Sequence, residues 1–373
     1  MGRQQHIARS VVQTISTRTN GGARRSRSPV AFLLALFSAL LSLYDLHLQK
    51  IRPADFANLR RKHWEVTDDA YTDSFQPGEC AEGRDTLKSI GDMGFSGSTF
   101  YSTADQKYLV KSVPRYSEHS FFREDLLTPY VEYMATHPRT LLVRICDFLG
   151  ARGASLGRLL GTAPSHHIVM ENIMYGRGEA KKRGDADWED WDLKPTSYFY
   201  PERDIAGGAL TSEATKNQLA DEFHGKIILS RAQADDFFSN LEADTKLLAE
   251  HNAVDYSLFL VRIKVPQPEV AADSGSSQAA SEIVPTEGPS VPPSPPSWRT
   301  GVASPDGKHI FRAAILDFFW AKHKIQPRFM TLLITLYNVL ISKKGPMSIT
   351  TTPDEYRARF LKMCRGIVEA REE

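Results

Sequence analysis

The sequence predicts an α+β fold, because apolar segments with two different periods are mixed along the chain. Residues 167–175, 257–265 and 311–319 are short apolar runs with the length and composition typical of strands. Residues 108–113, YLVKSV, show the two-residue alternation of a strand. Segments of helical period lie elsewhere in the chain, so neither an all-α nor an all-β fold is expected.

Two segments carry the signals of amphipathic helices. Residues 230–252 begin with Ser230 and Gln233 at the spacing of a capping box. A second helix is expected after Thr352, with Pro353 in its first turn, where proline is favoured. The side chains expected on the buried faces are Phe237, Leu241, Asp244 and Leu248 in the first helix and Tyr356, Phe360, Met363 and Ile367 in the second.

Size and charge limit the classes of function. The 373 residues suffice for one large domain or for two lobes with a core. The formal net charge is +1, so overall charge gives no argument for nucleic acid as a partner. Cys80, Cys146 and Cys364 lie far apart without metal-binding spacing, which indicates free thiols in a reducing compartment.

The N-terminal region differs from the rest in composition. Residues 1–44 contain arginines but no acidic residue, and we expect residues 1–28 to be a disordered basic arm. Residues 29–53 are expected to form an apolar helix. The apolar run from Pro29 to Tyr44 is shorter than the roughly 20 residues that span a bilayer. A buried or interfacial helix is favoured, while a mitochondrial presequence, a signal anchor and a spanning helix stay open.

Two stretches further on predict breaks in the folded structure. Residues 266–308 are rich in Pro, Ser, Ala and Glu, a composition that buries too little surface to offset chain entropy and predicts disorder. Because typical folded sequence lies on both sides, we expect one domain over residues 54–373 that this insertion interrupts. The charged stretch 176–190 is expected to be a surface loop.

One glycine-rich stretch is followed by a lysine in the next strand. In GDMGFSGSTFYSTADQKYLVKSV, residues 91–113, Gly94 and Gly97 would let backbone N–H groups approach an anion, and the neighbouring hydroxyls would add donors. Lys111 shares its strand face with apolar residues, so it is expected to have a charged partner. Alone, the pattern favours a plain glycine-rich hairpin over a phosphate-binding one.

Three aspartates lie at the ends of strand-like segments. Asp255 precedes one strand, Asp317 ends another, and Asp192 lies two residues before Lys194. Each alone is typical of a capping or turn aspartate. Phosphoryl transfer, however, needs a carboxylate near the acceptor hydroxyl and carboxylates on magnesium. Together with the glycine stretch and its lysine, the three aspartates weaken that interpretation and make a kinase an alternative, although spacing along the chain does not show that they converge.

The order of these segments resembles the phosphatidylinositol phosphate kinase family. The segments that carry the resemblance are GFSGSTFYSTADQKYLVKSV, HPRTLLVRICDFLG, HIVMENIMY, WDLKP, AVDYSLFLVRI and AAILD, and residues 54–75 are similar to the family's helix before the hairpin. The resemblance implies a two-lobed kinase-like fold with an antiparallel N-terminal sheet, helices and a smaller sheet in the C-terminal lobe. Residues 54–373 would be its catalytic domain, with ATP between the lobes.

The resemblance also assigns residues to ATP. Those implied around ATP are Gly94, Ser96, Gly97, Ser98 and Lys111 at the phosphates and Glu171 and Asn172 at the adenine hinge. Either Glu118 or Glu124, in the helix after the lysine strand, would be the ion partner of Lys111.

The implied chemistry lies in the second half of the chain. Asp255 would orient or deprotonate the acceptor hydroxyl, Asp317 would bind Mg²⁺, and Asp192 and Lys194 would act near the transferred phosphate. The chain departs from the family pattern at Pro195, where the family has glycine, and at Ala314, where the family has glycine before its magnesium aspartate. It departs again after Asp317, where Lys322, Lys324 and Arg328 would either bind the lipid headgroup or form a solvated basic turn.

The resulting hypothesis is a lipid kinase that uses ATP and Mg²⁺ to phosphorylate a phosphatidylinositol monophosphate, foremost the 4-phosphate to the 4,5-bisphosphate. It would be cytoplasmic and peripheral at the cytosolic face of the plasma membrane, with a homodimer also considered. Mitochondrial targeting by the Arg-rich start stays open. The alternatives are a weak or inactive kinase-like module that binds phosphoinositides or a protein, and a soluble inositol-phosphate or protein kinase.

Overall fold

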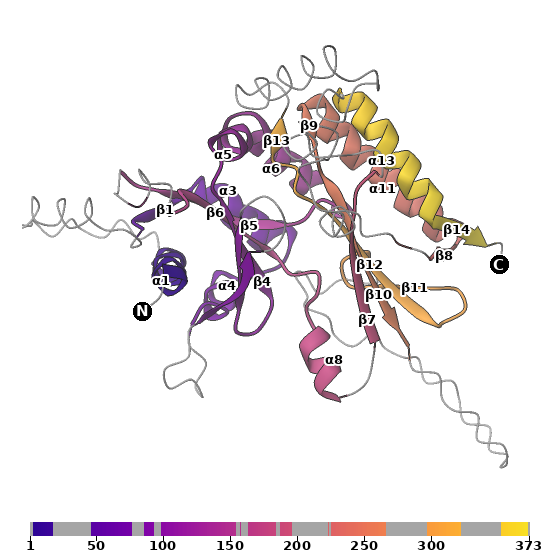
Figure 1. Cartoon of the computed structure of the whole chain (residues 1–373), viewed down its shortest axis with the longest axis horizontal. Coiled ribbons are helices and arrows are strands. Elements are labelled where there is room, and N and C mark those ends of the chain that lie inside the picture. Colours follow the sequence, from indigo (N-terminus) through magenta and orange to yellow (C-terminus); the bar gives the residue numbers. More distant parts are fainter. Residues whose placement is uncertain are drawn as a thin grey trace, which may run out of the picture. The chain divides into compact units, whose positions relative to one another are not determined.

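The computed structural model divides the chain into two compact units, which are described separately (Figure 1). The first unit comprises Met1–His119 and Arg144–Asn172, and the second comprises Ser120–Val143 and Ile173–Glu373. The structure describes residues 3–17, 46–76, 86–92, 98–153, 157, 163–183, 187–195, 223, 225–265, 297–321 and 352–371. Helices and mainly antiparallel sheets are mixed in them, as the sequence predicts.

The first unit is built on a six-stranded antiparallel sheet with the strand order β1-β5-β6-β4-β3-β2. Its strands are β1 (Leu48–Ile51), β2 (Leu87–Asp92), β3 (Thr99–Thr103), β4 (Tyr108–Val113), β5 (Ile145–Ala151) and β6 (His166–Glu171). The expected strand 108–113 is β4, and β2 and β3 flank the glycine stretch, of which residues 93–97 lie outside the described residues.

Short helices accompany this sheet. They are α1 (Arg3–Ser16), α3 (Pro53–Asn58), the π-helical turn η1 (Leu59–His63), α4 (Asp68–Asp73) and α5 (Tyr116–Phe121). The residues 54–75 that carry the family resemblance thus form α3, η1 and α4.

Two predictions for the N-terminal region are wrong for the residues that the structure describes. Residues 3–16 of the expected disordered arm form α1, because Ile7, Val11 and Ile15 repeat every four residues and bury one face of the helix. Residues 48–51 of the expected apolar helix form β1, which pairs with β5. The apolar run 29–44 lies outside the described residues, among which no helix is long and apolar enough to cross a membrane.

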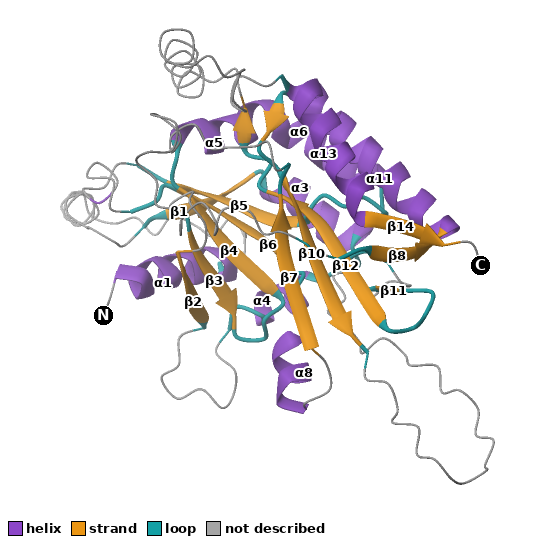
Figure 2. Cartoon of the chain, turned by 45° about the vertical axis from the view of Figure 1, so that its right-hand side comes forward, coloured by secondary structure: helices purple, strands orange, loops and turns teal. Residues whose placement is uncertain are grey.

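The second unit contains a four-stranded sheet with the order β11-β12-β10-β7. Its strands are β7 (Asp187–Leu193), β10 (Ser257–Lys264), β11 (Val302–Ala303) and β12 (His309–Leu316). β9 (Ala253–Val254) pairs with β13 (Trp320–Ala321), and β8 (Ile227–Ser230) pairs in parallel with β14 (Val368–Arg371). The strands expected near 257–265 and 311–319 are therefore present as β10 and β12 (Figure 2).

The helices of the second unit are η2 (Phe122–Leu126), α6 (Leu127–Thr136), α8 (Arg177–Arg183), α11 (Arg231–Glu250) and α13 (Pro353–Ile367). The capping box of α11 forms as expected, and Thr352 caps α13 by accepting a hydrogen bond from Glu355 N. The buried stripe of α11 matches the prediction. In α13, Leu361 and Cys364 are buried in place of the expected Met363 and Ile367.

Two expected irregular segments contain ordered structure. The stretch 176–190 holds α8 and most of β7, because its charges form cross-strand pairs: Asp187 with Lys264 at 2.9 Å and Glu189 with Arg262 at 2.7 Å. The end of the insertion 266–308 is also folded. Trp298 is buried, with its ring centroid 4.5 Å from that of Phe237, while residues 266–296 lie outside the described residues.

The expected strand 167–175 is shorter than predicted. β6 ends at Glu171, and residues 173–176 form a turn in the second unit. The buried Arg312 holds this turn, because its guanidinium donates to the carbonyl oxygens of Ile173 at 3.2 Å and Tyr175 at 2.9 Å. Burial lowers the pKa of Arg312 to about 10.

A buried carboxylate holds the segment Pro138–Leu142 in place, and this segment carries part of the family resemblance. Asp244 of α11 is fully buried and accepts hydrogen bonds from Tyr133 Oη at 2.8 Å, Thr140 Oγ1 at 2.6 Å and Leu141 N at 2.6 Å. Burial raises the pKa of Asp244 against the opposing effect of these donors. Thr140, Leu141 and Leu142 of this segment are therefore part of the folded core, while Pro138 and Arg139 are exposed.

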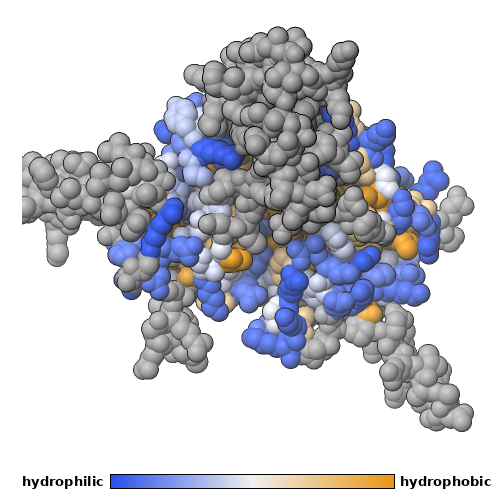
Figure 3. Space-filling view, in the orientation of Figure 1, coloured by the Kyte–Doolittle hydropathy of each residue, from blue (hydrophilic) through white to orange (hydrophobic). Residues whose placement is uncertain are grey.

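The surface of the described residues is largely polar. Figure 3 shows mostly hydrophilic residues on one face, with small scattered apolar areas. Among the described residues the large hydrophobic side chains that are exposed are Ile90 and Tyr116. The apolar groups of both units thus lie mainly in their cores.

Asp244→Ala should lower the free energy of unfolding by about 3 kcal/mol or more, because three buried donors lose their acceptor. Asp235→Ala, at an exposed position of the same helix, should change it by less than about 0.5 kcal/mol. Urea unfolding followed by circular dichroism measures both values. Equal small effects at the two positions would contradict the buried network.

The stability should depend on pH through His167, which is fully buried on β6, with neither ring nitrogen hydrogen-bonded among the described residues. Burial lowers its pKa to about 4. The unfolded chain takes up the proton below about pH 6.5 and the native state only near pH 4, so stability falls as the pH drops through this window. Protonation of His167 in the unfolded chain should lower the free energy of unfolding by about 2 kcal/mol between pH 7 and pH 5. His167→Phe should abolish that part of the loss, whereas the exposed His63→Phe should retain it.

Candidate functional site

Lys111 occupies the buried, apolar environment that the strand pattern predicts. It lies on β4 between Phe100 of β3 and Ile168 of β6, directly opposite both, so the three side chains share one face of the sheet. The residue is 5 % exposed, and its ammonium nitrogen lies 5.3 Å from the centre of the Phe100 ring. A buried ammonium on an apolar face is costly without compensating charge, so this position suits an anionic ligand or partner.

The helix that follows lies against the same face. The ring of His119 in α5 stacks on that of His166 at a centroid distance of 3.7 Å, and His166 faces Val113, two residues beyond Lys111 on β4. Glu118 of α5 pairs with Arg115 at 3.2 Å. Which glutamate serves Lys111 stays a prediction.

The predicted glycine loop is described only at its end. Gly94, Ser96 and Gly97 lie outside the described residues. Ser98 is buried immediately before β3, and the next amide, Thr99 N, donates to Ser112 Oγ of β4 at 2.8 Å. The hairpin is thus fixed where it enters β3, and the phosphate contacts of its loop stay a prediction.

The residues predicted at the adenine hinge form hydrogen bonds with the backbone of neighbouring segments. Glu171 exchanges two contacts with Arg144: its carboxylate accepts from Arg144 N at 2.8 Å, and its own N–H donates to Arg144 O at 3.0 Å. Asn172 donates through its backbone to Lys107 O at 3.0 Å and through its side chain to Gln106 O at 2.7 Å. The backbone N–H groups of Glu171 and Asn172 are therefore already hydrogen-bonded within the protein. A nucleotide would have to bind other atoms of this segment.

In the second unit, the sheet brings three predicted residues to one end. β10 runs antiparallel to both β7 and β12, with Leu258 opposite Leu193 and Ser257 opposite Leu316. Lys194 follows β7, Asp255 precedes β10 and Asp317 follows β12. Because the strands are antiparallel, these three positions lie at the same edge of the sheet.

The two aspartates occupy matching breaks in one ladder. β9 and β13 pair just beyond them, with Val254 opposite Trp320, so the ladder is interrupted between this pair and the Ser257–Leu316 pair. Asp255 has a φ of 68° and Asp317 a φ of 62°, in the left-handed region that side chains rarely adopt. Such strain persists only where the surroundings impose it and is frequent at functional sites.

Buried aromatic rings fix the chain next to each aspartate. Tyr256 packs against Tyr356 and Phe360 of α13, with ring centroids 4.7 and 4.9 Å apart. Phe318 and Phe319, after Asp317, pack against Tyr130 at 5.9 Å and Phe122 at 5.1 Å. These anchors are not among the residues predicted from the sequence, although an aromatic residue directly follows each aspartate there.

Lys194 and Asp255 form a direct ion pair. The Lys194 ammonium donates to Asp255 Oδ1 at 2.6 Å, and the two side chains are 14 % and 17 % exposed. Two residues that were selected from distant segments are therefore in contact, and solvent screens the pair only partly. Asp192 is exposed on β7, directly opposite Phe259.

Other predicted features add less. Pro195 and Ala314 are buried. Lys322, Lys324 and Arg328 lie outside the described residues. Within the described part of the chain, no group of three or more His, Cys, Asp or Glu side chains could hold a metal ion. Asp317 therefore belongs to no such group of described side chains, and a magnesium ion held there would need oxygen ligands from water or phosphate as well, which is usual for Mg²⁺.

Comparison with known proteins decides the family. A family model described as phosphatidylinositol-4-phosphate 5-kinase matches residues 81–367, which is more than half of the chain. The chain belongs to this family. The match includes Lys111, Lys194, Asp255 and Asp317.

Individual relatives of the phosphatidylinositol-4-phosphate 5-kinase family are distant. "Probable phosphatidylinositol phosphate kinase" of Dictyostelium discoideum is 26% identical over 187 residues, covering 50% of this chain and 24% of that protein. "Phosphatidylinositol 4-phosphate 5-kinase its3" of Schizosaccharomyces pombe is 26% identical over 178 residues, covering 47% and 21%. The human "Phosphatidylinositol 4-phosphate 5-kinase-like protein 1" is 25% identical over 180 residues, covering 47% and 40%. The matches span less than half the length of these relatives.

The backbone at Asp317 can be tested by comparing two substitutions that remove the same carboxylate. Asp317→Gly should be more stable than Asp317→Ala by about 1 kcal/mol, because glycine adopts a positive φ without strain. At Asp235, inside α11, the order should reverse, with alanine more stable by about 1 kcal/mol. Thermal unfolding of the four variants measures both differences, and alanine being equal or better at Asp317 would refute the left-handed geometry.

Proposed function

We propose that this protein is a phosphatidylinositol phosphate kinase that transfers the γ-phosphate of ATP to a ring hydroxyl of a phosphatidylinositol monophosphate. The acceptor to test first is phosphatidylinositol 4-phosphate, with the 4,5-bisphosphate as product. The single observation that carries the proposal is the Lys194–Asp255 ion pair, at 2.6 Å, at the sheet edge that also holds Asp317. Membership of the family supports it.

Asp255 would orient the acceptor hydroxyl and accept its proton. A carboxylate that already pairs with Lys194 is held in position before the substrate arrives, and a fixed geometry is the main requirement of phosphoryl transfer. The ammonium of Lys194 would then balance negative charge near the transferred phosphate. Asp192, two residues earlier on the exposed side of β7, is proposed to act next to it.

Asp317 would hold Mg²⁺, whose positive charge would neutralise the phosphate oxygens. Asp317 suits Mg²⁺ because it is a partly buried residue with a carboxylate, and carboxylate oxygens are ligands that Mg²⁺ prefers. In the first unit, the buried ammonium of Lys111 would bind the ATP phosphates, with the glycine stretch from Gly94 to Ser98 around them.

The acceptor lies in a bilayer, so the enzyme would work as a peripheral protein at the cytosolic face of a membrane. Lys322, Lys324 and Arg328 would contact the headgroup phosphates, since basic side chains are attracted to anionic lipid surfaces. These residues lie 5 to 11 positions after Asp317 in the sequence.

The proposal predicts that Asp255→Asn, which keeps the size of the side chain and tolerates a positive φ, lowers the transfer rate at least about 100-fold. The measurement is transfer of radiolabel from ATP to vesicles that contain one phosphatidylinositol monophosphate isomer at a time. Asp235→Asn, at an exposed site on α11, should keep the rate within about twofold.

Two outcomes would overturn parts of this proposal. No label on any monophosphate isomer, under conditions where a known family member works, would exclude lipid kinase activity. Soluble inositol phosphates and a protein acceptor in the same series would then separate a kinase with another acceptor from an inactive binding module. An unchanged rate in Asp255→Asn would remove Asp255 from its assigned role.

A further inference from the structure

Helix α1 contacts both outer strands of the six-stranded sheet. It packs against β1 at one end of the strand order and against β2 at the other. Six strands at a spacing of about 4.8 Å place their outer strands roughly 24 Å apart, and a 14-residue helix is about 21 Å long. The helix can therefore reach both strands by running across the sheet, and Figure 2 shows it crosswise to β2 and β3.

Three kinds of contact hold α1 in this position. Its buried face consists of Ile7, Ala8, Ser10, Val11 and Ile15. Ser10 Oγ accepts a buried hydrogen bond from Leu46 N at 3.0 Å, just before β1. At the other end, the ammonium of Lys50 in β1 donates to Ile15 O at 3.0 Å, where a cation also interacts favourably with the helix dipole.

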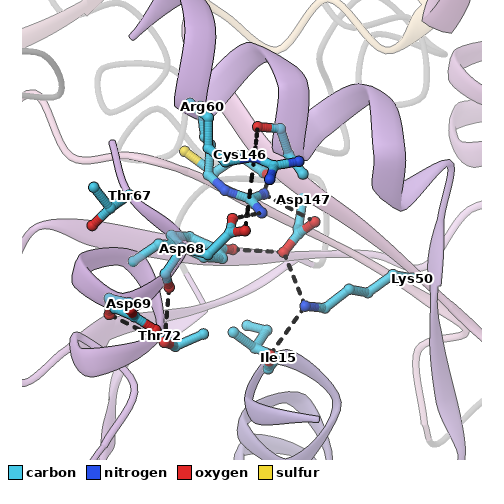
Figure 4. A network of polar contacts seen from close by, with 12 residues as sticks. Ile15, Lys50, Arg60, Thr67, Asp68, Asp69, Thr72, Cys146 and Asp147 are labelled. Atoms are coloured by element: carbon cyan, nitrogen blue, oxygen red, sulfur yellow. Dashed lines mark hydrogen bonds and ion pairs between the residues drawn. The ribbon is translucent and has the colours of Figure 1, made fainter. Parts of the chain in front are cut away.

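Lys50 also joins a buried network on the sheet (Figure 4). Its ammonium lies 3.9 Å from Asp147 of β5, a fully buried residue that pairs with Arg60 at 3.3 Å and accepts from Tyr71 Oη at 2.9 Å. Burial by itself would lower the pKa of Arg60, but the Asp147 carboxylate and other groups raise it above the ordinary value. Lys50 thus links the end of α1 to the buried Asp147–Arg60 ion pair, whose two members hold each other in place.

The network lies on the face of the sheet opposite to Lys111. Asp147, Val169 and Val110 are directly opposite one another on β5, β6 and β4. Lys111 is the next residue on β4, so its side chain points to the other face. Through Lys50, therefore, α1 is attached to the face of the sheet opposite to Lys111. Helix α1 could affect a ligand bound at Lys111 only by changing the positions of the strands.

The strand through which α1 could affect a ligand near Lys111 is β2. Among the described strands, this outer strand pairs with β3 alone, and its register shifts between Ser89 and Gly91, where Gly91 has a φ of 103°. β2 leads directly into the glycine stretch at residues 93–97. We infer that α1 is a brace that fixes β2 and, through the pairing of β2 with β3, the strand whose Phe100 lies opposite Lys111, so that docking of α1 controls nucleotide binding. The nucleotide part rests on the proposed function; the brace itself does not.

The test compares Val11→Asp, on the buried face of α1, with Gln13→Asp, on its exposed face. Hydrogen exchange is measured in the peptide that covers residues 86–103, with residues 257–264 of β10 as reference. Val11→Asp should speed exchange in the first peptide at least tenfold and leave the reference unchanged, while Gln13→Asp should change neither. In the lipid kinase assay, Val11→Asp should raise the KM for ATP several-fold with kcat within about twofold.

Lys50→Met is the second variant, which removes the ammonium and keeps an apolar stem. It should show the same exchange and KM effects, and Lys50→Arg should restore both. Unchanged protection of residues 86–103 in Val11→Asp and Lys50→Met, with α1 itself exchanging freely, would overturn the brace. Faster exchange in the two variants, combined with no kinase activity in the wild type, would support the brace and refute the proposed function. An active wild type whose KM for ATP is unchanged in the two variants would refute the control of nucleotide binding.

Discussion

The antiparallel pairing of β10 with β7 and β12 is the constraint on which the proposed chemistry depends. Lys194, Asp255 and Asp317 come from three segments that span more than 120 residues of sequence, and only the register of these strands brings them to one edge. A shift of one residue between β7 and β10 would turn the side chains of the shifted strand to the other face and separate the ammonium from its carboxylate, and a shift between β10 and β12 would displace Asp317. The apolar cluster of Val261, Ile263 and Ala314 on this sheet is therefore also what fixes the register of the site.

Several polar residues in or next to the segments that carry the family resemblance have a structural role. Asp244 receives the donors of the segment around Thr140, and Glu171 and Asn172 satisfy backbone groups at the end of β6. Arg60 and Tyr71, from the segment before the hairpin, converge on the buried Asp147. Buried polar groups of this kind are costly unless every member is paired, so a motif can recur for structural reasons alone.

The sequence was informative where one physical signal dominated. The two-residue alternation around Lys111 and the capping box at Ser230 predicted β4 and α11, since both are local patterns. Composition misled at the N-terminus and at the insertion: the buried stripe of α1 and the buried Trp298 each lie in a segment of otherwise polar or small residues. The charges around Glu189 indicated a loop, although across a strand pair they are neutralised. The contact between Lys194 and Asp255 could be expected only from the family resemblance, because spacing along the chain says nothing about register.

The positive φ of Asp255 and Asp317 restricts what these positions can become. Glutamate would keep the charge but fits the left-handed backbone poorly, whereas asparagine and glycine fit the backbone and lose the charge. A copy of this gene released from selection for phosphoryl transfer, yet still required to fold, would therefore be expected to drift toward asparagine or glycine at these two sites. Duplicates that have lost the chemistry would then be recognisable from two letters of their sequence.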